Sequence, residues 1–418
     1  MKRVYIATCM FVLILLASCS NVTETSSYQP KEDYDTFISE YNDIANEISI
    51  LLLENGENIS ISPSSILNVI AIIYETTTIQ NQEKISKHFS VPKEKLGSYF
   101  CQLFNSLKKV YYSDELKYNN DGSVYREKIG GLDISNSFWY NETKNVESKN
   151  ASKLIDEYNL HINKVKFGKE TDKKISEYIK ETTDGLIDLS DQLYFPEQTL
   201  YSLINVQYLM DRWGTKDLIY SQDKYSFTNS NGTKKDINLL IGKYIDGVAI
   251  EKEQYKYFYT ETANGYKLKF IVPKEKYSID DIMKKEVLTE VSNINKFNDT
   301  ESENHATRCL FPAFETGYSK DILNVLNDYF DGLFSDKDLL SGLIKNDITS
   351  AEQLLHATKV NVDEKGIRAA AATLVSNYGS AGSQKTYHDF MVDRSFMYII
   401  TDSNDIELFV GTVDNMVN

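Results

Sequence analysis

The sequence contains few of the residues on which enzymes most often depend. Histidine occurs only five times in 418 residues, as His88, His161, His305, His356 and His388, and none lies in His-Glu-x-x-His spacing. The chain also lacks a Gly-x-Ser-x-Gly nucleophile turn and a glycine-rich phosphate loop. These absences argue against metalloprotease, serine hydrolase and nucleotide-dependent chemistry. We therefore expect a protein that is not an enzyme and that needs no metal or cofactor.

Cysteine is equally scarce, with four residues in the whole chain. Cys9 and Cys19 belong to the N-terminal segment, which leaves Cys101 and Cys309 for the folded part. These two could pair, since a disulfide is permitted outside the cell, or they could stay buried and free. Neither has a neighbouring histidine and acid that would mark it as a nucleophile.

Positive charge is also in short supply. The 45 Lys and Arg residues face 61 Asp and Glu residues, which gives a net charge of −16. A nucleic-acid surface requires the opposite sign, so we expect no nucleic-acid partner. With 41% hydrophobic residues the chain can still bury a large core. We expect a soluble, folded monomer.

The N-terminus is the one strongly apolar stretch. Lys2 and Arg3 precede an apolar run over residues 4–16, which is typical of a secretion signal and too short for a membrane span. The following Ala17-Ser18-Cys19 resembles a bacterial lipoprotein processing site. By that resemblance residues 1–18 are removed and Cys19 carries the lipid. The alternative is an ordinary signal peptide that is cut nearby.

The rest of the N-terminal segment contains little that a core could bury. Residues 19–33 are polar and predict a flexible tether. Together with the resemblance at Cys19, this predicts an exported protein that is lipid-anchored at the cell membrane or the cell surface of a bacterium.

Regular periods predict a mixed α+β chain over residues 34–418. Helical spacing of apolar residues occurs over 34–53, 66–74, 76–90, 96–112, 146–158, 172–183, 279–292 and 322–330. Strand patterns occur over 132–139, 200–209, 245–250, 255–260, 266–272 and 359–363. Residues 113–131 are polar and contain Asn-Asp-Gly, which indicates a loop or a hairpin.

Residues 364–376 allow two interpretations. The run from Ala369 to Ala372 favours a short helix on propensity alone. An extended segment is the alternative, in which Ile367, Ala371 and Val375 share one face and Arg368 lies on the other. Small side chains would let such a segment slide between strands without clashes.

Several motifs together resemble the serpins, the serine protease inhibitor family. The segment from Glu364 through Gly366 to Thr373 is similar to the serpin hinge, which joins a strand of the main sheet to the reactive-centre loop. Further matches are Asn58–Ile66, Leu200–Trp213, Arg308–Phe314, Phe390–Ile400 and Glu407–Val413. The resemblance implies an α+β serpin fold, with N-terminal helices, three β-sheets and an exposed loop over about 364–388.

The resemblance also implies a region where the main sheet opens. Ser62, Ser65, Asn205 and His356 would form hydrogen bonds beneath the sheet, and Trp213 would lie where the loop first enters. Ser62 is also a plausible helix N-cap before Pro63. Trp213 could equally be an ordinary core residue.

The implied activity is suicide inhibition. A serine or cysteine protease attacks the loop and becomes covalently attached, and the hinge then inserts into the main sheet. The hinge residues are Glu364, Gly366, Ile367, Ala369, Ala370, Ala371, Ala372 and Thr373. Ile367 replaces the usual small hydroxyl residue and Arg368 replaces an acid, so a non-inhibitory, surface-binding serpin remains the alternative.

The position of the bait residue follows from the same resemblance. Counting from Gly366 places the reactive bond at Ser380–Ala381, with Tyr378 and Gly379 as alternatives because the loop is slightly short. Small residues there favour an elastase-like or papain-like target, and cleavage after Tyr378 would favour a chymotrypsin-like one. Residues 374–384 contain no Lys or Arg, which disfavours a trypsin-like target.

Overall fold

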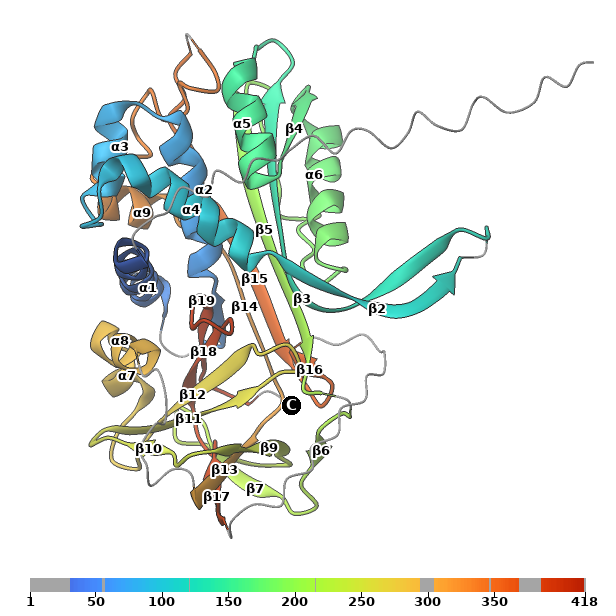
Figure 1. Ribbon diagram of the computed structural model, residues 1–418, viewed down its shortest axis with the longest axis vertical. Helices are drawn as coiled ribbons and strands as arrows, with labels where there is room; N and C mark the ends of the chain where they lie inside the picture. Colours follow the sequence, from blue (N-terminus) through green and yellow to red (C-terminus); the bar gives the residue numbers. More distant parts are fainter. Residues whose placement is uncertain are drawn as a thin grey trace, which may run out of the picture.

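The N-terminal third of the molecule is mainly helical and the remainder mainly β (Figure 1). The computed structural model describes residues 31–54, 57–119, 121–214, 216–293, 304–345, 347–367 and 385–416. Its helices are α1 (Lys31–Leu52), α2 (Pro63–Thr76), α3 (Ile79–Ser86), α4 (Lys93–Leu107), α5 (Ser148–Tyr158), α6 (Lys169–Thr182), α7 (Ile279–Ile282), α8 (Lys285–Asn293) and α9 (Leu323–Tyr329). Across these described ranges, no helix has the length and apolar character that crossing a membrane requires.

The largest sheet has seven strands and is called the main sheet below. Its order is β14-β15-β16-β5-β3-β2, and β4 pairs with β3 beside this path. The strands are β14 (Phe314–Asp321), β15 (Leu355–Val362), β16 (Gly366–Ile367), β5 (Tyr201–Arg212), β3 (Val124–Asn141), β2 (Lys109–Tyr118) and β4 (Leu160–Val165). All pairs are antiparallel except β3–β4, which is parallel.

Two further sheets and a short hairpin complete the β-structure. A six-stranded sheet runs β1 (Ile59–Ile61), β19 (Glu407–Val413), β18 (Phe396–Thr401), β12 (Lys267–Pro273), β11 (Tyr255–Glu261) and β10 (Ile250–Glu251). A four-stranded sheet runs β17 (Thr386–Met391), β13 (His305–Phe311), β9 (Leu240–Asp246) and β6 (Ile219–Tyr220), and β7 (Tyr225–Thr228) pairs with β8 (Lys234–Ile237). The predicted α+β class with three main sheets is confirmed.

The core lies between the main sheet, the six-stranded sheet and α2. Every residue of β18 and β19 is buried, which explains why these strands are mostly apolar along their length rather than alternating. Helix α2 packs against both β5 and β19. It begins directly after Ser62, with Pro63 in its first turn, as the local sequence predicts.

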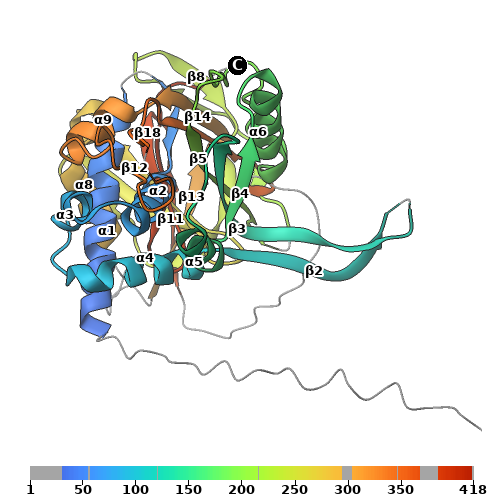
Figure 2. The same ribbon diagram turned by 90° about the horizontal axis from the view of Figure 1, so that it is seen from above.

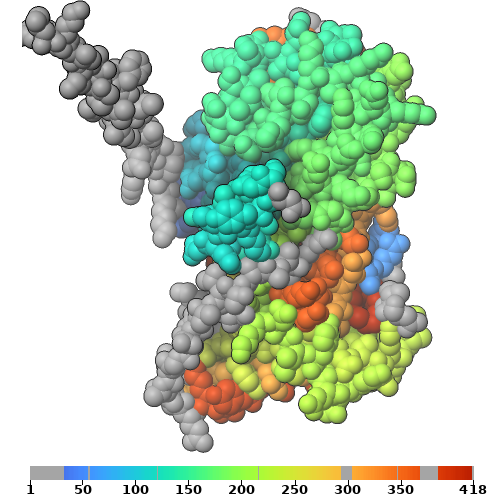
Figure 3. Space-filling model, turned by 90° about the vertical axis from the view of Figure 1, so that its right-hand side faces the viewer, coloured from blue at the N-terminus to red at the C-terminus, as the bar shows by residue number. Residues whose placement is uncertain are grey.

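The structure corrects one helix boundary. The helix predicted over residues 96–112 ends at Leu107, and residues from Lys109 onward form β2 instead. Val110, Tyr111 and Tyr112 are β-branched or aromatic, and strand pairing with β3 prevails over their helical spacing. The hairpin predicted after residue 112 is therefore longer than expected, and it projects from the body of the molecule (Figure 2). Figure 3 looks onto its tip.

Candidate functional site

The centre of the main sheet is parted. Strands β5 and β15 are separated by β16, which pairs with β5 at Gly366↔Arg212 and Ile367↔Asp211 and with β15 at Val362↔Ile367. Along the rest of their length, the described parts of β5 and β15 share no backbone ladder. Among the described residues, most of the length of both strands therefore has no hydrogen-bonded neighbour on the facing side.

The start of the predicted hinge occupies the lower end of this gap. The side chain of Ile367 is only 2% exposed. A Cβ atom on Gly366 would lie 2.0 Å from the carbonyl oxygen of Asp211, so only glycine allows β16 to approach β5 this closely. The burial of Ile367 is what its apolar side chain favours, although serpins usually carry a small hydroxyl residue at this point.

A polar turn fixes the chain just before β16. The Asp363 carboxylate accepts hydrogen bonds from the backbone N–H groups of Lys365 (2.8 Å) and Gly366 (3.2 Å). The carbonyl of Glu364 accepts from the N–H of Leu218 at 2.7 Å. The turn is therefore tied both to itself and to the segment that follows β5.

Trp213 lies beside this turn. Its side chain is 1% exposed, and its indole N–H donates to the carbonyl of Asp363 at 2.7 Å. Its ring meets Phe311 edge-on, with 5.5 Å between centroids. Trp213 is thus a core residue and also a neighbour of the hinge, so the two interpretations of this residue describe one position.

The other predicted sheet-opening residues form a separate cluster beneath the sheet. The backbone N–H of Ser62 donates to Nε2 of His356 at 3.1 Å, and Oγ of Ser65 donates to Oδ1 of Asn205 at 2.5 Å. Trp213 follows Asn205 by eight positions on the same chain segment, about 26 Å along an extended strand. The structure therefore brings Ser62, Ser65, Asn205 and His356 together and leaves Trp213 at the other end of β5.

Three further polar residues belong to this cluster. Oγ of Ser64 donates to Oε1 of Gln207 at 2.7 Å, and Nδ2 of Asn205 donates to Oδ1 of Asn136 at 2.7 Å. Ser64 stands between two residues of the predicted set, and Gln207 follows Asn205 by two positions, on the same face of the strand. These two sequence positions could have identified Ser64 and Gln207 as members of the cluster.

His356 is held in its neutral form. The side chain is 6% exposed, and this burial lowers the pKa of the imidazole from its ordinary value of 6.5 to about 4. A neutral imidazole leaves Nε2 free to accept the hydrogen bond from Ser62. The link between α2 and β15 therefore depends on an unprotonated histidine.

A cavity of about 670 Å³ lies where β5 and β15 fail to pair. Its lining includes Leu203 and Asn205 of β5, Leu355 and Ala357 of β15, and Phe195 from the segment after α6. This is far more room than a buried water needs. The parted region of the sheet is therefore hollow, with a lining of both apolar and polar side chains.

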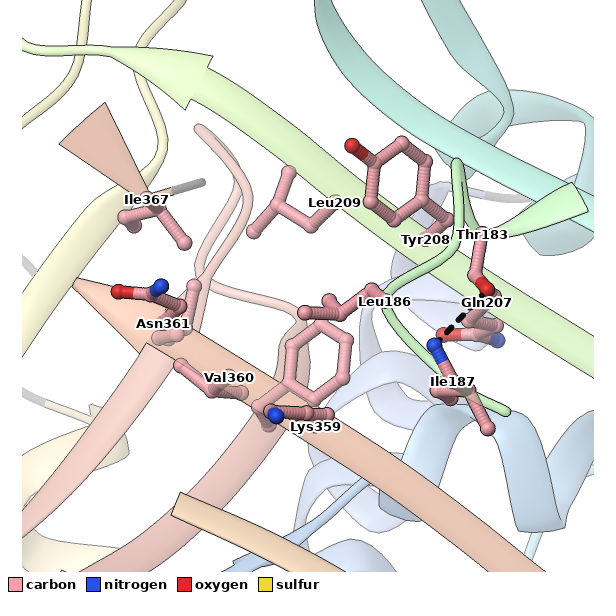
Figure 4. A pocket seen from close by; sticks show the side chains of 12 residues that line it. Thr183, Leu186, Ile187, Gln207, Tyr208, Leu209, Lys359, Val360, Asn361 and Ile367 are labelled. Carbon is pink, nitrogen blue, oxygen red and sulfur yellow. Dashed lines mark hydrogen bonds between the residues drawn. The ribbon is translucent and has the colours of Figure 1, made fainter. Parts of the chain in front are cut away.

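A second, much smaller gap of about 10 Å³ continues toward the hinge. Figure 4 shows Leu209 of β5 and Val360 of β15 on its two sides, with Ile367 at one end. The hollow thus narrows along the sheet until β16 fills the space between the two strands.

Several predicted features lie outside the described residues. They are Cys19, Arg368, the hinge residues Ala369, Ala370, Ala371, Ala372 and Thr373, and the bait residues Tyr378, Gly379, Ser380 and Ala381. Cys101 and Cys309 are described and both are free, which settles the question of their pairing. In the described part of the chain, no group of three or more His, Cys, Asp or Glu residues is placed to hold a metal ion.

Comparison with known proteins agrees with this architecture. The family model described as Serpin (serine protease inhibitor) matches residues 41–416. Iripin-1 of Ixodes ricinus is 24% identical over 379 residues, covering 86% of this chain and 89% of its own. A serpin-like protein of Methanosarcina mazei is 24% identical over 397 residues, covering 89% and 84%. The native-state structure of the thermophilic serpin tengpin superposes with a TM-score of 0.70 at 21% identity, covering 91% and 94%.

Proposed function

Because this chain belongs to the serpin family, we propose that it inhibits a serine endopeptidase, or a cysteine endopeptidase, as a suicide substrate. Members of the family are generally protease inhibitors rather than enzymes. One observation carries the proposal for this chain. The hinge already starts as β16 between β5 and β15, and a cavity lies between the same two strands further along their length.

The proposed reaction uses the loop as bait. The protease nucleophile attacks a loop carbonyl, forms an acyl-enzyme and releases the new amino terminus. The freed hinge then enters between β5 and β15 as a longer strand and draws the attached protease with it. We take the attacked bond to be Ser380–Ala381, with Tyr378 and Gly379 as alternatives, and the target to be elastase-like or chymotrypsin-like.

The energy available from insertion is of the right size. Each new backbone hydrogen bond contributes about 0.5–1.5 kcal/mol. Apolar side chains that enter the hollow add about 25 cal/mol per Å² of buried area. A strand of some ten residues therefore yields a gross gain comparable with the ~5–15 kcal/mol stability of a protease domain. This is enough to distort an attached active site before it deacylates.

The polar cluster allows the sheet to open while its buried polar groups find hydrogen-bond partners. Hydroxyl and amide side chains such as Ser62, Ser64, Asn205 and Gln207 can exchange partners when the strands above them move. Burial without partners would be costly for such groups. We therefore propose that this cluster supports the parting of β5 and β15.

The direct test is to incubate the chain lacking residues 1–19 with elastase, chymotrypsin and papain, followed by denaturing gels and intact mass. The expected result is a covalent adduct with release of a C-terminal fragment that begins at or near Ala381. Clean cleavage by every protease without an adduct would reject inhibition and favour the non-inhibitory, surface-binding alternative.

A pair of variants tests insertion itself. If the hinge inserts as a continuous strand, Ala371 will share a face with Ile367, which is buried in β16, and Ala370 will belong to the opposite face. Ala371→Arg should convert the inhibitor into a substrate, and the matched Ala370→Arg should still form the adduct. Equal inhibition by both variants would contradict the insertion of the hinge.

We also propose that the protein is exported, that Cys19 is lipidated after removal of residues 1–18, and that residues 19–33 tether a monomer to the membrane. The support is the N-terminal sequence alone. Labelling with an alkyne fatty acid should tag the wild type and not Cys19→Ala, which should appear in the medium. Equal labelling of both would reject the anchor.

A further inference from the structure

Two histidines lie side by side on β13 and β17, the strand that follows residues 368–384 in the chain. Nδ1 of His305, in β13, lies 2.8 Å from Nε2 of His388, in β17, and the ring centroids are 5.1 Å apart. The strands run parallel, and His388 lies opposite Thr307, so the two histidines are diagonal neighbours on one face of the sheet. Both side chains are partly buried.

The distance between the two nitrogens suits a shared metal ion. Two metal–nitrogen bonds of about 2.0 Å that meet at a right angle place the nitrogens about 2.8 Å apart, whereas a tetrahedral ion separates them by about 3.3 Å. Right angles are typical of Cu²⁺ and Ni²⁺ bound by nitrogen ligands. We propose that His305 and His388 form a two-imidazole site for a divalent transition-metal ion of this type. It would be reached by small ring rotations from the present hydrogen bond.

The charged neighbours are engaged elsewhere. Arg308 holds Asp389 through two contacts, at 2.6 and 3.2 Å, and Lys385 pairs with Asp246 at 2.5 Å. The register places Arg308 opposite Asp389 and Ala306 opposite Asp246, so these carboxylates belong to the other face of the sheet. The ion would thus have two neutral ligands, and water would complete its coordination.

A bound ion would fasten an edge strand. Among the described residues, β17 is the last strand of its sheet, and its ladder there consists of six residue pairs with β13. An ion shared by one residue from each strand adds a cross-link at the first residues of that ladder. Its effect on the behaviour of the loop rests on the proposed function, but the site itself does not.

The experiment uses untagged, metal-free protein and titrates NiCl₂ and CuCl₂ by calorimetry. We expect one ion per chain, and binding weakened at least about tenfold in His305→Asn and in His388→Asn. At a nickel concentration of about 100 Kd, Tm should rise by roughly 3–6 °C. His161→Asn, at an exposed histidine of β4, is the matched control and should bind as the wild type does.

Two further readouts keep the test decisive. The electron paramagnetic resonance spectrum of the copper complex should show coupling to imidazole nitrogens and lose it in His388→Asn. If either variant fails to fold, nickel should protect His305 and His388 of the wild type from acylation by diethyl pyrocarbonate. Absence of binding, or equal binding by wild type and His388→Asn, overturns the site. None of these measurements involves a protease, so they stand apart from the test of inhibition.

Discussion

The two ends of the segment 368–384 are attached to the body in opposite ways. On the N-terminal side, β16 is only two residues long, yet it lies inside the seven-stranded sheet with a strand on each side. On the C-terminal side, β17 makes six residue pairs but has a single neighbour at the edge of its sheet. One end is held by burial and close packing, and the other by a longer ladder at the surface.

This difference indicates which end is prepared to extend. No described strand lies between β5 and β15 beyond β16, and the cavity of about 670 Å³ lies further along these two strands, so residues could add to β16 without displacing a described strand. β17 is already paired with β13 over all six of its residues. The comparison also predicts that single substitutions at the N-terminal end should be far more costly than those at the C-terminal end.

The largest effect is expected from Gly366→Val. Any Cβ atom there would lie 2.0 Å from the carbonyl oxygen of Asp211 and 2.8 Å from Cα of Arg212, so β16 should leave the sheet. Exposure of Ile367 and loss of its pairing should lower the free energy of unfolding by about 2–4 kcal/mol. Urea unfolding measures this loss, and the covalent adduct with a protease should also disappear.

The control for that variant is Lys365→Val, one position away in the exposed turn. It should change the stability by less than about 0.5 kcal/mol, as surface substitutions usually do. A comparable loss in both variants would mean that the turn, rather than the close approach of β16 to β5, holds the N-terminal end.

Only part of this end could be predicted from local signals. The alternation before Asp363 indicates a strand, but local propensity after Gly366 favours a helix, and the hinge was identified through resemblance to a family. The cluster of Ser62, Asn205 and His356 was also predictable, but only through resemblance to a family. Trp213 was expected apart from that cluster, where the loop first enters, and the structure places it beside the turn before β16.

The C-terminal end was harder to predict because its contacts are not local. His305 and His388 are 83 residues apart, and only the parallel register of β13 and β17 places them side by side. Such a register depends on how whole sheets assemble, which single-chain periodicity does not specify. The boundary after Leu107 was missed for a related reason, since pairing with β3 decides the structure of residues 109–112.

A change of pH should weaken the cluster beneath the parted strands. The pKa of His356 is about 4 in the folded protein, against 6.5 when unperturbed. Below pH 6.5 His356 is therefore protonated in the unfolded chain but stays neutral in the folded chain. The free energy of unfolding decreases as the pH falls toward 4. Between pH 7.5 and 5 this one group should cost about 2 kcal/mol.

The measurement compares chemical unfolding of the wild type and His356→Gln at several pH values. Glutamine can still accept the hydrogen bond from Ser62 but does not titrate. The free energy of unfolding of His356→Gln should therefore decrease less than that of the wild type, by the cost assigned to His356 above. The difference between the curves is needed because burial raises the pKa of Glu407 to about 7, which acts in the opposite direction. Parallel curves would show that His356 is not held neutral.

The smallest effect is expected at the C-terminal end, from Arg308→Met. The guanidinium of Arg308 contacts Asp389 of β17 at 2.6 and 3.2 Å, but the two side chains are 29% and 43% exposed. An exposed ion pair contributes about 0.2–1 kcal/mol and is screened by salt. A double-mutant cycle with Asp389→Asn should give a coupling energy in this range that shrinks at high salt. A coupling energy larger than the loss of stability in Gly366→Val would contradict this comparison, because β17 would then be the more strongly held end.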